Sequence, residues 1–271
     1  MRHQSYQRAI ITGASSGLGE EFAYQLAPYV DELILIARRR DRLTIVGESS
    51  RRINPALQVS CLPGDLTDPS FMIPLIHMLT GLPSARTLLI NNAGMGDYGE
   101  FSTADWDKIE SMIVLNIFTL TKLCHSLIPT LETAGGGIIN ISSLASALPI
   151  PDFAVYAASK AYVLSLSEAL RLELKEKNIN VLAVCPGPVH TEFGQIARRP
   201  GFTGDMMPGK QMFDTSRERV VSEALSAMAK NKSRVYPGGP IKWSHILLSL
   251  LPAPVIRWVM GRRPRRSLLQ T

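Results

Sequence analysis

Short apolar runs rich in β-branched residues alternate with helical stretches along most of the chain. The apolar runs span residues 8–12, 33–37, 57–62, 87–91, 137–142 and 179–184, and helical patterns span 17–27, 40–53, 68–81, 104–130 and 154–177. Such alternation builds a parallel sheet, because each helix returns the chain to the edge where the previous strand began. The sequence therefore predicts an α/β fold with a doubly wound parallel sheet and helices on both faces.

Size and composition indicate a single packed domain. The chain has 271 residues, of which 45% are apolar and 19% charged, and one α/β domain often exceeds about 200 residues. Disordered and collagen-like chains have other compositions. Beyond residue 185, Pro, Gly and Met become frequent, and 216–230 is the only clear helix before residue 237. We interpret that part as a cap or lid on the sheet.

The cysteines and the N-terminus point to a reducing compartment. Cys61, Cys124 and Cys185 are odd in number, lie in apolar stretches and lack any CxxC or Cys/His ligand spacing, so a disulfide scaffold and a zinc site are not expected. The first eight residues hold no apolar run of the kind that a secretory signal needs. We therefore expect a cytoplasmic protein without a metal site.

The net charge of +6 comes from the C-terminal tail. The last acidic residue is Glu223, and residues 224–271 carry nine Lys and Arg, whereas the first 223 residues carry 20 basic and 23 acidic side chains. This distribution argues against nucleic-acid binding over the whole chain and favours a local anionic partner.

A glycine-rich turn directly follows the first expected strand. Residues 12–19 read TGASSGLG and open a helix. Glycine permits the tight turn and lets the backbone approach a pyrophosphate, and the free N–H groups at the helix start attract its charge. Its position at the first strand–helix junction predicts a dinucleotide-binding turn instead of an ordinary one. The predicted contacts are Gly13, Ser15, Ser16, Gly17, Leu18 and Gly19.

The end of the second strand predicts which dinucleotide is bound. Dinucleotide folds often carry an acid there for the adenosine ribose, but this chain has Ala37 followed by Arg38. Ala37 leaves room, and Arg38 offers a planar cation to a 2′-phosphate, which favours NADP over NAD. The alternative is that residues 38–42 simply begin a solvated helix.

Tyr156 and Lys160 stand four residues apart on an expected helix, so their side chains share one face. A tyrosine with an ordinary pKa of about 10 is a poor acid–base catalyst near neutrality. A neighbouring ammonium favours the phenolate, so we expect Lys160 to lower the pKa of Tyr156. By itself such a pair is common on protein surfaces.

Taken in order, the motifs resemble the short-chain dehydrogenase/reductase family over about residues 8–192. The motifs are the glycine turn, Asp65, the run Asn91, Asn92, Ala93 and Gly94, then Asn116, Ser142 with Ser143, Tyr156 with Lys160, and Pro186 with Gly187. The resemblance implies a Rossmann fold, an NADP(H)-dependent oxidoreductase and a homodimer or homotetramer.

The resemblance also implies a catalytic tetrad. Tyr156 would donate a proton to a substrate carbonyl, and Ser143 would orient and polarise that carbonyl. Lys160 would hold the nicotinamide ribose, and Asn116 would hold a water that relays protons through Lys160. A buried structural asparagine is the alternative for Asn116, and Ser142 is expected to be structural.

Further cofactor contacts follow from the same resemblance. Asp65 and Leu66 would lie beside the adenine, and the segment after residue 185 would receive the carboxamide end of the nicotinamide. The implied contacts are Asp65, Leu66, Asn92, Ala93, Gly94, Pro186, Gly187, Val189 and Thr191. We expect Asn91 to tie strands together, Asp68 to cap a helix, and His190 to be a surface residue.

Substrate specificity is expected downstream of these motifs. Residues 190–215 carry Phe193, Phe202, Met206, Met207, Met212 and Phe213 among glycines, which suits a mobile apolar lid, although a merely flexible loop has the same composition. Met95, Tyr98, Leu144 and Pro149 are expected in the pocket walls. We assign residues 1–240 to the catalytic domain and 241–271 to a basic, apolar extension.

The extension has two interpretations. Its longest uncharged apolar stretch, residues 246–256, has 11 residues and two prolines, which is shorter than the roughly 20 residues of a membrane span. It either packs on this or a neighbouring subunit or lies peripherally on an anionic membrane surface.

Three functions are consistent with the sequence. The first is reduction of a hydrophobic ketone or aldehyde by NADPH, or alcohol oxidation in reverse. The second is reduction of a 3-oxoacyl or other lipid-type carbonyl at a membrane surface. The third is a non-catalytic NADP-binding regulator.

Overall fold

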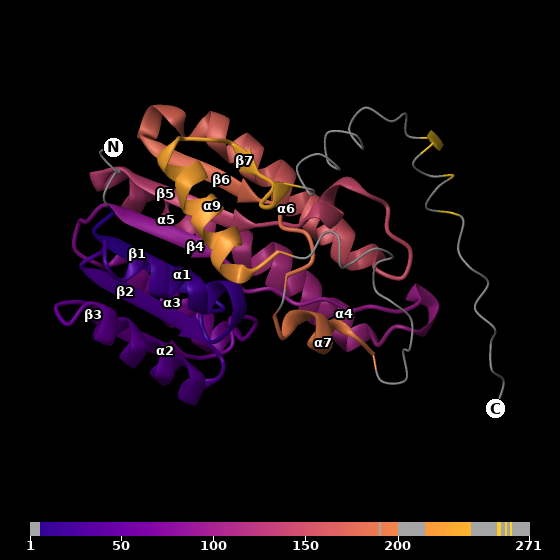
Figure 1. Cartoon of the computed structure of the whole chain (residues 1–271), viewed down its shortest axis with the longest axis horizontal. Coiled ribbons are helices and arrows are strands. Elements are labelled where there is room, and N and C mark those ends of the chain that lie inside the picture. Colours follow the sequence, from indigo (N-terminus) through magenta and orange to yellow (C-terminus); the bar gives the residue numbers. More distant parts are fainter. Residues whose placement is uncertain are drawn as a thin grey trace.

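The computed structural model describes residues 6–189, 191–199 and 215–239, together with Pro254, Val255, Trp258 and Gly261. Within these residues the chain forms one sheet of seven parallel strands, in the order β3-β2-β1-β4-β5-β6-β7 (Figure 1). The strands are β1 (Arg8–Thr12), β2 (Glu32–Ala37), β3 (Gln58–Pro63), β4 (Thr87–Asn91), β5 (Gly136–Ile141), β6 (Ile179–Val184) and β7 (Arg234–Val235). The strand order reverses between β1 and β4, where open α/β sheets bind ligands.

Helices cover both faces of this sheet (Figure 1). One layer holds α1 (Gly17–Leu26), α2 (Arg40–Ile53) and α9 (Arg217–Ala229), and the other holds α3 (Pro69–Thr80), α5 (Leu120–Ala134) and α6 (Ala154–Glu173). Successive strand residues face opposite layers: Ile11 packs with α1 and α2, whereas Ile10 packs with α3 and α5. The predicted doubly wound α/β fold is confirmed.

The helix expected at 104–130 is interrupted by a wider turn. It consists of α4 (Trp106–Ile113), the π-helical turn η2 (Val114–Thr119) and α5. The run Trp106–Ala134 is long enough to cross a membrane, and an 18-residue window within it has a mean hydropathy of 1.5. Four of its leucines, Leu120, Leu123, Leu127 and Leu131, are nevertheless buried against the sheet, as in the core helix of a globular domain.

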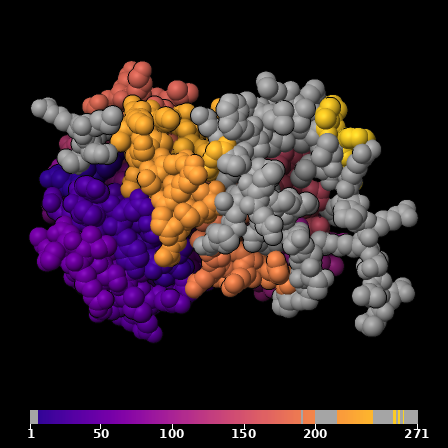
Figure 2. Space-filling view, viewed as in Figure 1, coloured from indigo at the N-terminus to yellow at the C-terminus, as the bar shows by residue number. Residues whose placement is uncertain are grey.

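The segment after residue 215 differs from the expected cap. α9 places Val220, Val221 and Ala224 in the core beside α1, and β7 extends the sheet next to β6. Figure 2 shows residues 215–239, in yellow-orange, lying against the indigo N-terminal part. This segment therefore completes a helix layer and the sheet. Val220 and Val221 supply the apolar face of α9. β7 has only two residues, which is too short a strand to recognise from the sequence.

Short elements complete the description of the fold. They are the 3₁₀ turns η1 (Phe101–Thr103), η3 (Leu144–Ala147) and η4 (Lys175–Lys177) and the helix α7 (Phe193–Ala197), which the sequence analysis missed. Asp68 caps α3, since its side chain accepts from the Ser70 backbone N–H. Most of the expected lid, and nearly all of the C-terminal extension, lie outside the described residues.

Candidate active site

A large cavity of about 1970 Å³ opens at the carboxyl ends of the strands. Its walls come from the glycine-rich turn, the ends of β2, β4 and β5, the start of α6 and the segment after β6. Pockets for drug-sized ligands have about 300–1,000 Å³. This cavity therefore has room for a dinucleotide together with a substrate.

The glycine-rich turn fits closely against the loop after β4. Gly13 and Gly17 have φ of 65° and 61°, and a Cβ on Gly13 would lie 2.9 Å from the Ala93 Cα. The Asn92 side chain donates to the carbonyl oxygens of Thr12 and Gly13 at 3.0 and 3.1 Å. The backbone can pass so close to its neighbours only because these positions lack side chains.

Gly19 is the one predicted residue of this turn that does not line the cavity. A Cβ there would lie 2.3 Å from the Gly13 carbonyl oxygen. Its function is therefore to bring α1 close to the turn, which is a packing requirement of such motifs. The other predicted residues of the turn do line the cavity: Gly13, Ser15, Ser16, Gly17 and Leu18.

Arg38 and Asp65 are the residues predicted for the adenosine end of the cofactor. Both line the cavity, with Arg38 Nη1 3.7 Å from Asp65 Oδ2, and the Arg38 side chain is 67% exposed. Asp65 Oδ1 accepts from the backbone and hydroxyl of Thr67 at 2.9 and 2.7 Å. Asp65 therefore shapes its own loop as well as facing Arg38. Leu66, Ala93 and Gly94 also line the cavity.

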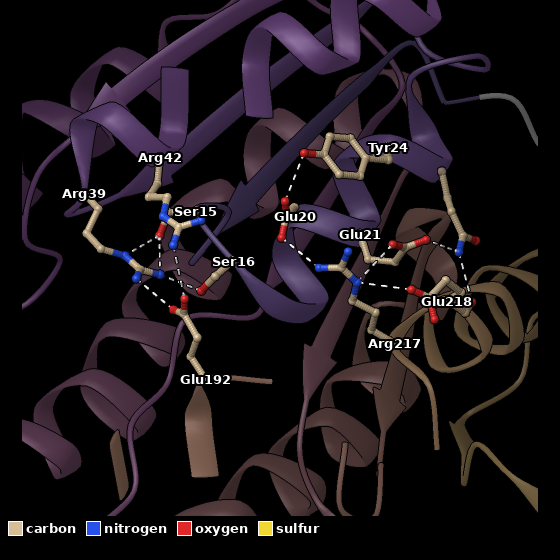
Figure 3. Close-up of polar contacts among 11 residues, drawn as sticks. Ser15, Ser16, Glu20, Glu21, Tyr24, Arg39, Arg42, Glu192, Arg217 and Glu218 are labelled. Atoms are coloured by element: carbon tan, nitrogen blue, oxygen red, sulfur yellow. Dashed lines mark hydrogen bonds and ion pairs between the residues drawn. The ribbon is translucent and has the colours of Figure 1, made fainter. Parts of the chain in front are cut away.

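Two further arginines, Arg39 and Arg42, line this end of the cavity and were not predicted from the sequence. Arg39 Nη2 donates to Ser16 Oγ at 2.6 Å, and Arg39 and Arg42 both face the Glu192 carboxylate (Figure 3). All of them line the cavity. The signal was present as the run of three arginines at 38–40, but no sequence pattern indicates which arginine turns inward.

Three predicted catalytic residues meet in the middle of the cavity. Tyr156 and Lys160 project from one face of α6 and are 7% and 4% exposed. Lys160 Nζ donates to the Ile141 carbonyl at 2.8 Å and lies 5.7 Å from the Tyr156 ring centroid. Ser143, from the loop after β5, accepts from the Ala145 N–H at 3.1 Å, and its hydroxyl acts to lower the pKa of Tyr156.

Burial dominates the ionisation of this pair. It raises the pKa of Tyr156 to about 12, against a smaller lowering by the Ser143 hydrogen bond. Burial also lowers the pKa of Lys160 to about 8, opposed by the charge interaction with Cys185. The expectation that Lys160 lowers the phenol pKa is therefore wrong for the protein alone, because both groups are removed from water. At neutral pH the phenol is a protonated donor.

Asn116 and Ser142 are both buried, and of the two only Ser142 lines the cavity. Asn116 occupies the π-helical turn, 1% exposed, donates to Met95 O and Ser159 Oγ and accepts from Met95 N. A Cβ on Gly94 would lie 3.3 Å from both Asn116 Oδ1 and Lys160 Nζ. π-Helical turns are frequent at functional sites. Ser142 is structural, as expected, and donates to the Lys160 carbonyl at 2.8 Å.

Aromatic rings surround the phenol. Phe153 stacks on Tyr156 with ring centroids 4.2 Å apart, and Phe193 of α7 lies at 5.5 Å. Met95, Tyr98 and Leu144 line the cavity as predicted, whereas Pro149 does not. Sequence analysis missed Phe153, Leu148 and Ile150, which also line it. Phe153 lies three residues before Tyr156, at the N-terminal cap of α6, the helix that carries Tyr156.

The segment after β6 closes the other side. Pro186, Gly187, Val189 and Thr191 line the cavity, and a Cβ on Gly17 would lie 3.1 Å from Thr191 Cγ2. This segment therefore faces the glycine-rich turn across the cleft. His190 and the aromatic and methionine residues expected in the lid, apart from Phe193, lie outside the described residues. Asn91 ties β4 to β5 through Asn140 Oδ1 at 2.8 Å.

Known proteins are similar to this chain in sequence and in fold. The family model described as short chain dehydrogenase matches residues 7–200. The chain is 32% identical over 258 residues to the 11-beta-hydroxysteroid dehydrogenase-like 2 of Arabidopsis thaliana, covering 90% of this chain and 77% of that protein. It is 29% identical over 258 residues to the very-long-chain 3-oxoacyl-CoA reductase of Neurospora crassa, covering 93% and 71%. A solved short-chain dehydrogenase from Sphingobium yanoikuyae in complex with NADPH superposes with a TM-score of 0.76 at 28% identity, covering 96% and 97%.

Proposed function

The chain belongs to the short chain dehydrogenase family, and from this premise we propose that it reduces an apolar ketone or aldehyde with NADPH and oxidises the alcohol in reverse. One observation carries the proposal: the phenol of Tyr156, the hydroxyl of Ser143 and the ammonium of Lys160 converge in a cavity that continues to the glycine-rich turn. A merely structural Tyr–Lys pair does not require such a cavity.

The residues present fit NADP(H). The side-chain-free turn at Gly13 and Gly17 leaves the backbone open to a pyrophosphate. Arg39 contacts Ser15 and Ser16, and Arg38 lines the same cavity, so these two arginines would take the 2′-phosphate. The structural relative from Sphingobium yanoikuyae is described as a complex with NADPH. When bound, the nicotinamide supplies the hydride to the substrate carbon, and the protein supplies position and a proton.

Tyr156 is the proton donor in this proposal. Its buried phenol stays protonated at neutral pH, with a pKa of about 12, and gives its proton to the carbonyl oxygen as negative charge develops there. Ser143 donates a second hydrogen bond to that oxygen. Lys160, held in place by its hydrogen bond to Ile141 O, binds the nicotinamide ribose. Asn116 is buried, and its Oδ1 and the Lys160 Nζ both lie close to Gly94.

The walls around the phenol favour an apolar substrate. Phe153, Phe193, Tyr98 and Met95 bring apolar surface to the reacting end of the cavity, and apolar surface binds by being removed from water. The Arabidopsis relative carries a hydroxysteroid dehydrogenase-like name. The lid at 190–215 and the extension at 241–271 would add to this surface.

A lipid-type 3-oxoacyl substrate is the second candidate. The observation that favours it is the Neurospora relative, named a very-long-chain 3-oxoacyl-CoA reductase. The basic, apolar extension would then contact an anionic membrane surface, whereas for a small ketone it would pack on its own or a neighbouring subunit of a homo-oligomer.

The test is a substrate panel followed by NADPH absorbance. The panel contains aromatic and alicyclic ketones, aldehydes and 3-oxoacyl thioesters of increasing chain length, each with NADPH and with NADH. The proposal predicts turnover that prefers NADPH and rises with apolar size. Turnover confined to long 3-oxoacyl thioesters selects the second candidate. Binding of NADPH without turnover of any carbonyl contradicts both and favours a regulator.

A further inference from the structure

An ion pair joins the two walls of the cleft. Arg39 Nη1 lies 2.7 Å from Glu192 Oε2, and Arg42 Nη2 lies 3.6 Å from Glu192 Oε1 (Figure 3). The arginines come from the end of β2 and the start of α2, and Glu192 comes from the segment after β6, 153 residues from Arg39 in the sequence. The pair therefore connects the adenosine side of the cavity with the substrate side.

The Arg39 guanidinium contacts Glu192 through one nitrogen and the serines of the glycine-rich turn through the other two. Its Nη1 meets Glu192, while its Nε and Nη2 contact Ser15 Oγ at 3.4 Å each and its Nη2 donates to Ser16 Oγ at 2.6 Å. The hydrogen bond from Arg39 lowers the pKa of Glu192 from its ordinary value, so the carboxylate is charged at neutral pH. The Glu192 carboxylate is thus an internal anion paired with Arg39, the same cation that contacts Ser15 and Ser16 of the glycine-rich turn.

Among the described residues, the charges of Arg39, Arg42 and Glu192 do not balance. Two guanidinium groups face one carboxylate, which leaves one positive charge for a further anion. A phosphate monoester carries about two negative charges at neutral pH. It would attract Arg39 more strongly than Glu192 does and would repel the Glu192 carboxylate. The ion pair is also half-exposed, at 43% and 38% for the two side chains, and such pairs open at small cost.

We propose that Glu192 sets cofactor selectivity, as an internal anion that occupies Arg39 until the 2′-phosphate of NADP(H) takes its place. The inference rests on the proposed function, since it needs NADP(H) as the cofactor. Loss of the ion pair frees the segment that carries Phe193, which follows Glu192 directly and lies 5.5 Å from the Tyr156 ring. NADH has no 2′-phosphate, so it leaves the ion pair in place.

Calorimetric binding of NADPH and NADH to the full chain tests the proposal without turnover. Glu192→Gln keeps the size of the side chain and removes the competing charge. We expect it to bind NADPH about threefold more tightly, which is the scale of a half-exposed ion pair, and to bind NADH unchanged. In an Arg39→Gln background, the gain from Glu192→Gln should be smaller, because the Arg39–Glu192 ion pair is already absent and only the longer pair with Arg42 remains.

Two control variants separate the ion pair from a general effect of charge. Glu20→Gln removes a carboxylate that also lines the cavity but is held by Arg217 at 2.9 Å, as Figure 3 shows. Glu132→Gln breaks a remote pair with Lys177 of similar length, 2.8 Å, and similar exposure. Both should leave the ratio of NADPH to NADH affinity unchanged.

Three outcomes overturn the inference. One is an equal gain from Glu20→Gln, which would show that only the net charge matters. Another is weaker binding of both nucleotides by Glu192→Gln, which would show that the Arg39–Glu192 ion pair helps to hold any dinucleotide in the cleft. The third is an unchanged NADPH affinity in Glu192→Gln. If the wild-type protein binds neither nucleotide, the proposed function itself fails, and this inference fails with it.

Discussion

Tyr156 and Lys160 show how burial decides the protonation of neighbouring groups. Both are removed from water, and each is driven towards its neutral form: the phenol pKa rises to about 12, and the ammonium pKa falls to about 8. Sequence spacing correctly places them on one face of a helix. It does not give the depth of burial, which depends on Phe153, Phe193 and the sheet beneath.

The shifted pKa of Lys160 predicts a pH dependence of stability. The unfolded chain keeps this proton up to the ordinary pKa of 10.5, whereas the folded protein releases it above about 8. Between these values the unfolded state binds more protons, so this group makes stability rise with pH. Relative to Lys160→Met, wild type should gain up to about 3 kcal/mol from pH 8 to 10.5, measured by urea unfolding. A constant difference over that range would contradict the burial of a charged lysine.

The two adjacent serines predict separable effects. Ser143→Ala removes the proposed donor to the developing oxyanion, so we expect kcat to fall about a hundredfold to a thousandfold, with only a small loss of stability from the hydrogen bond to the Ala145 N–H. Ser142→Ala removes the hydrogen bond to the buried Lys160 carbonyl, so its main effect should be a loss of about 1–3 kcal/mol in stability. Kinetics and denaturation of both variants check this, and an exchange of the two phenotypes would reverse the assignment.

Among the elements, the buried strands were the easiest to predict. Residues 8–12, 87–91 and 179–184 are apolar enough to be buried on both faces, and the structure places β1, β4 and β6 within those bounds. The π-helical turn at Asn116 could not be predicted, because apolar side chains recur on both sides of it. β7 has only two residues, and its pairing with Ala183 and Val184 defines it.

The third glycine of the turn predicts an effect on packing between elements. Gly19→Ala would place a Cβ 2.3 Å from Gly13 O and 2.6 Å from Asn92 Nδ2, which forces α1 away from the turn. We expect a loss of about 1–3 kcal/mol and weaker NADPH binding. Gly239→Ala is the control, since no atom of the described residues lies within 4 Å of its added Cβ. Equal unfolding midpoints for the two variants would contradict the close packing.

At the scale of the whole molecule, one sheet positions most of the site, and α6 adds Tyr156 and Lys160. The glycine-rich turn, Asp65, the loop after β4, Ser143 and the segment after β6 all follow carboxyl ends of strands. Motif order along the chain therefore predicts their convergence. Contacts such as Arg39 with Glu192 arise only from the folded arrangement, and no sequence pattern contains them.

The position of α9 predicts a single cooperative unit. Val221 is fully buried in the core that contains α1, so Val221→Ala should lower the stability of the entire domain by about 2 kcal/mol. Circular dichroism and tryptophan fluorescence should report one coincident transition, shifted equally. Two transitions, of which only the smaller shifts, would make residues 215–239 an independent cap.

The most direct measurement of the central claim is single-turnover hydride transfer by Tyr156→Phe with a carbonyl that the wild-type protein reduces. The variant keeps the ring between Phe153 and Phe193 and loses only the hydroxyl group, which carries the proton. We predict NADPH oxidation slowed by about a hundredfold or more, with the Kd for NADPH, determined in the same samples, unchanged. Single-turnover rates equal to those of wild type would show that the phenol does not supply the proton and would contradict the mechanism.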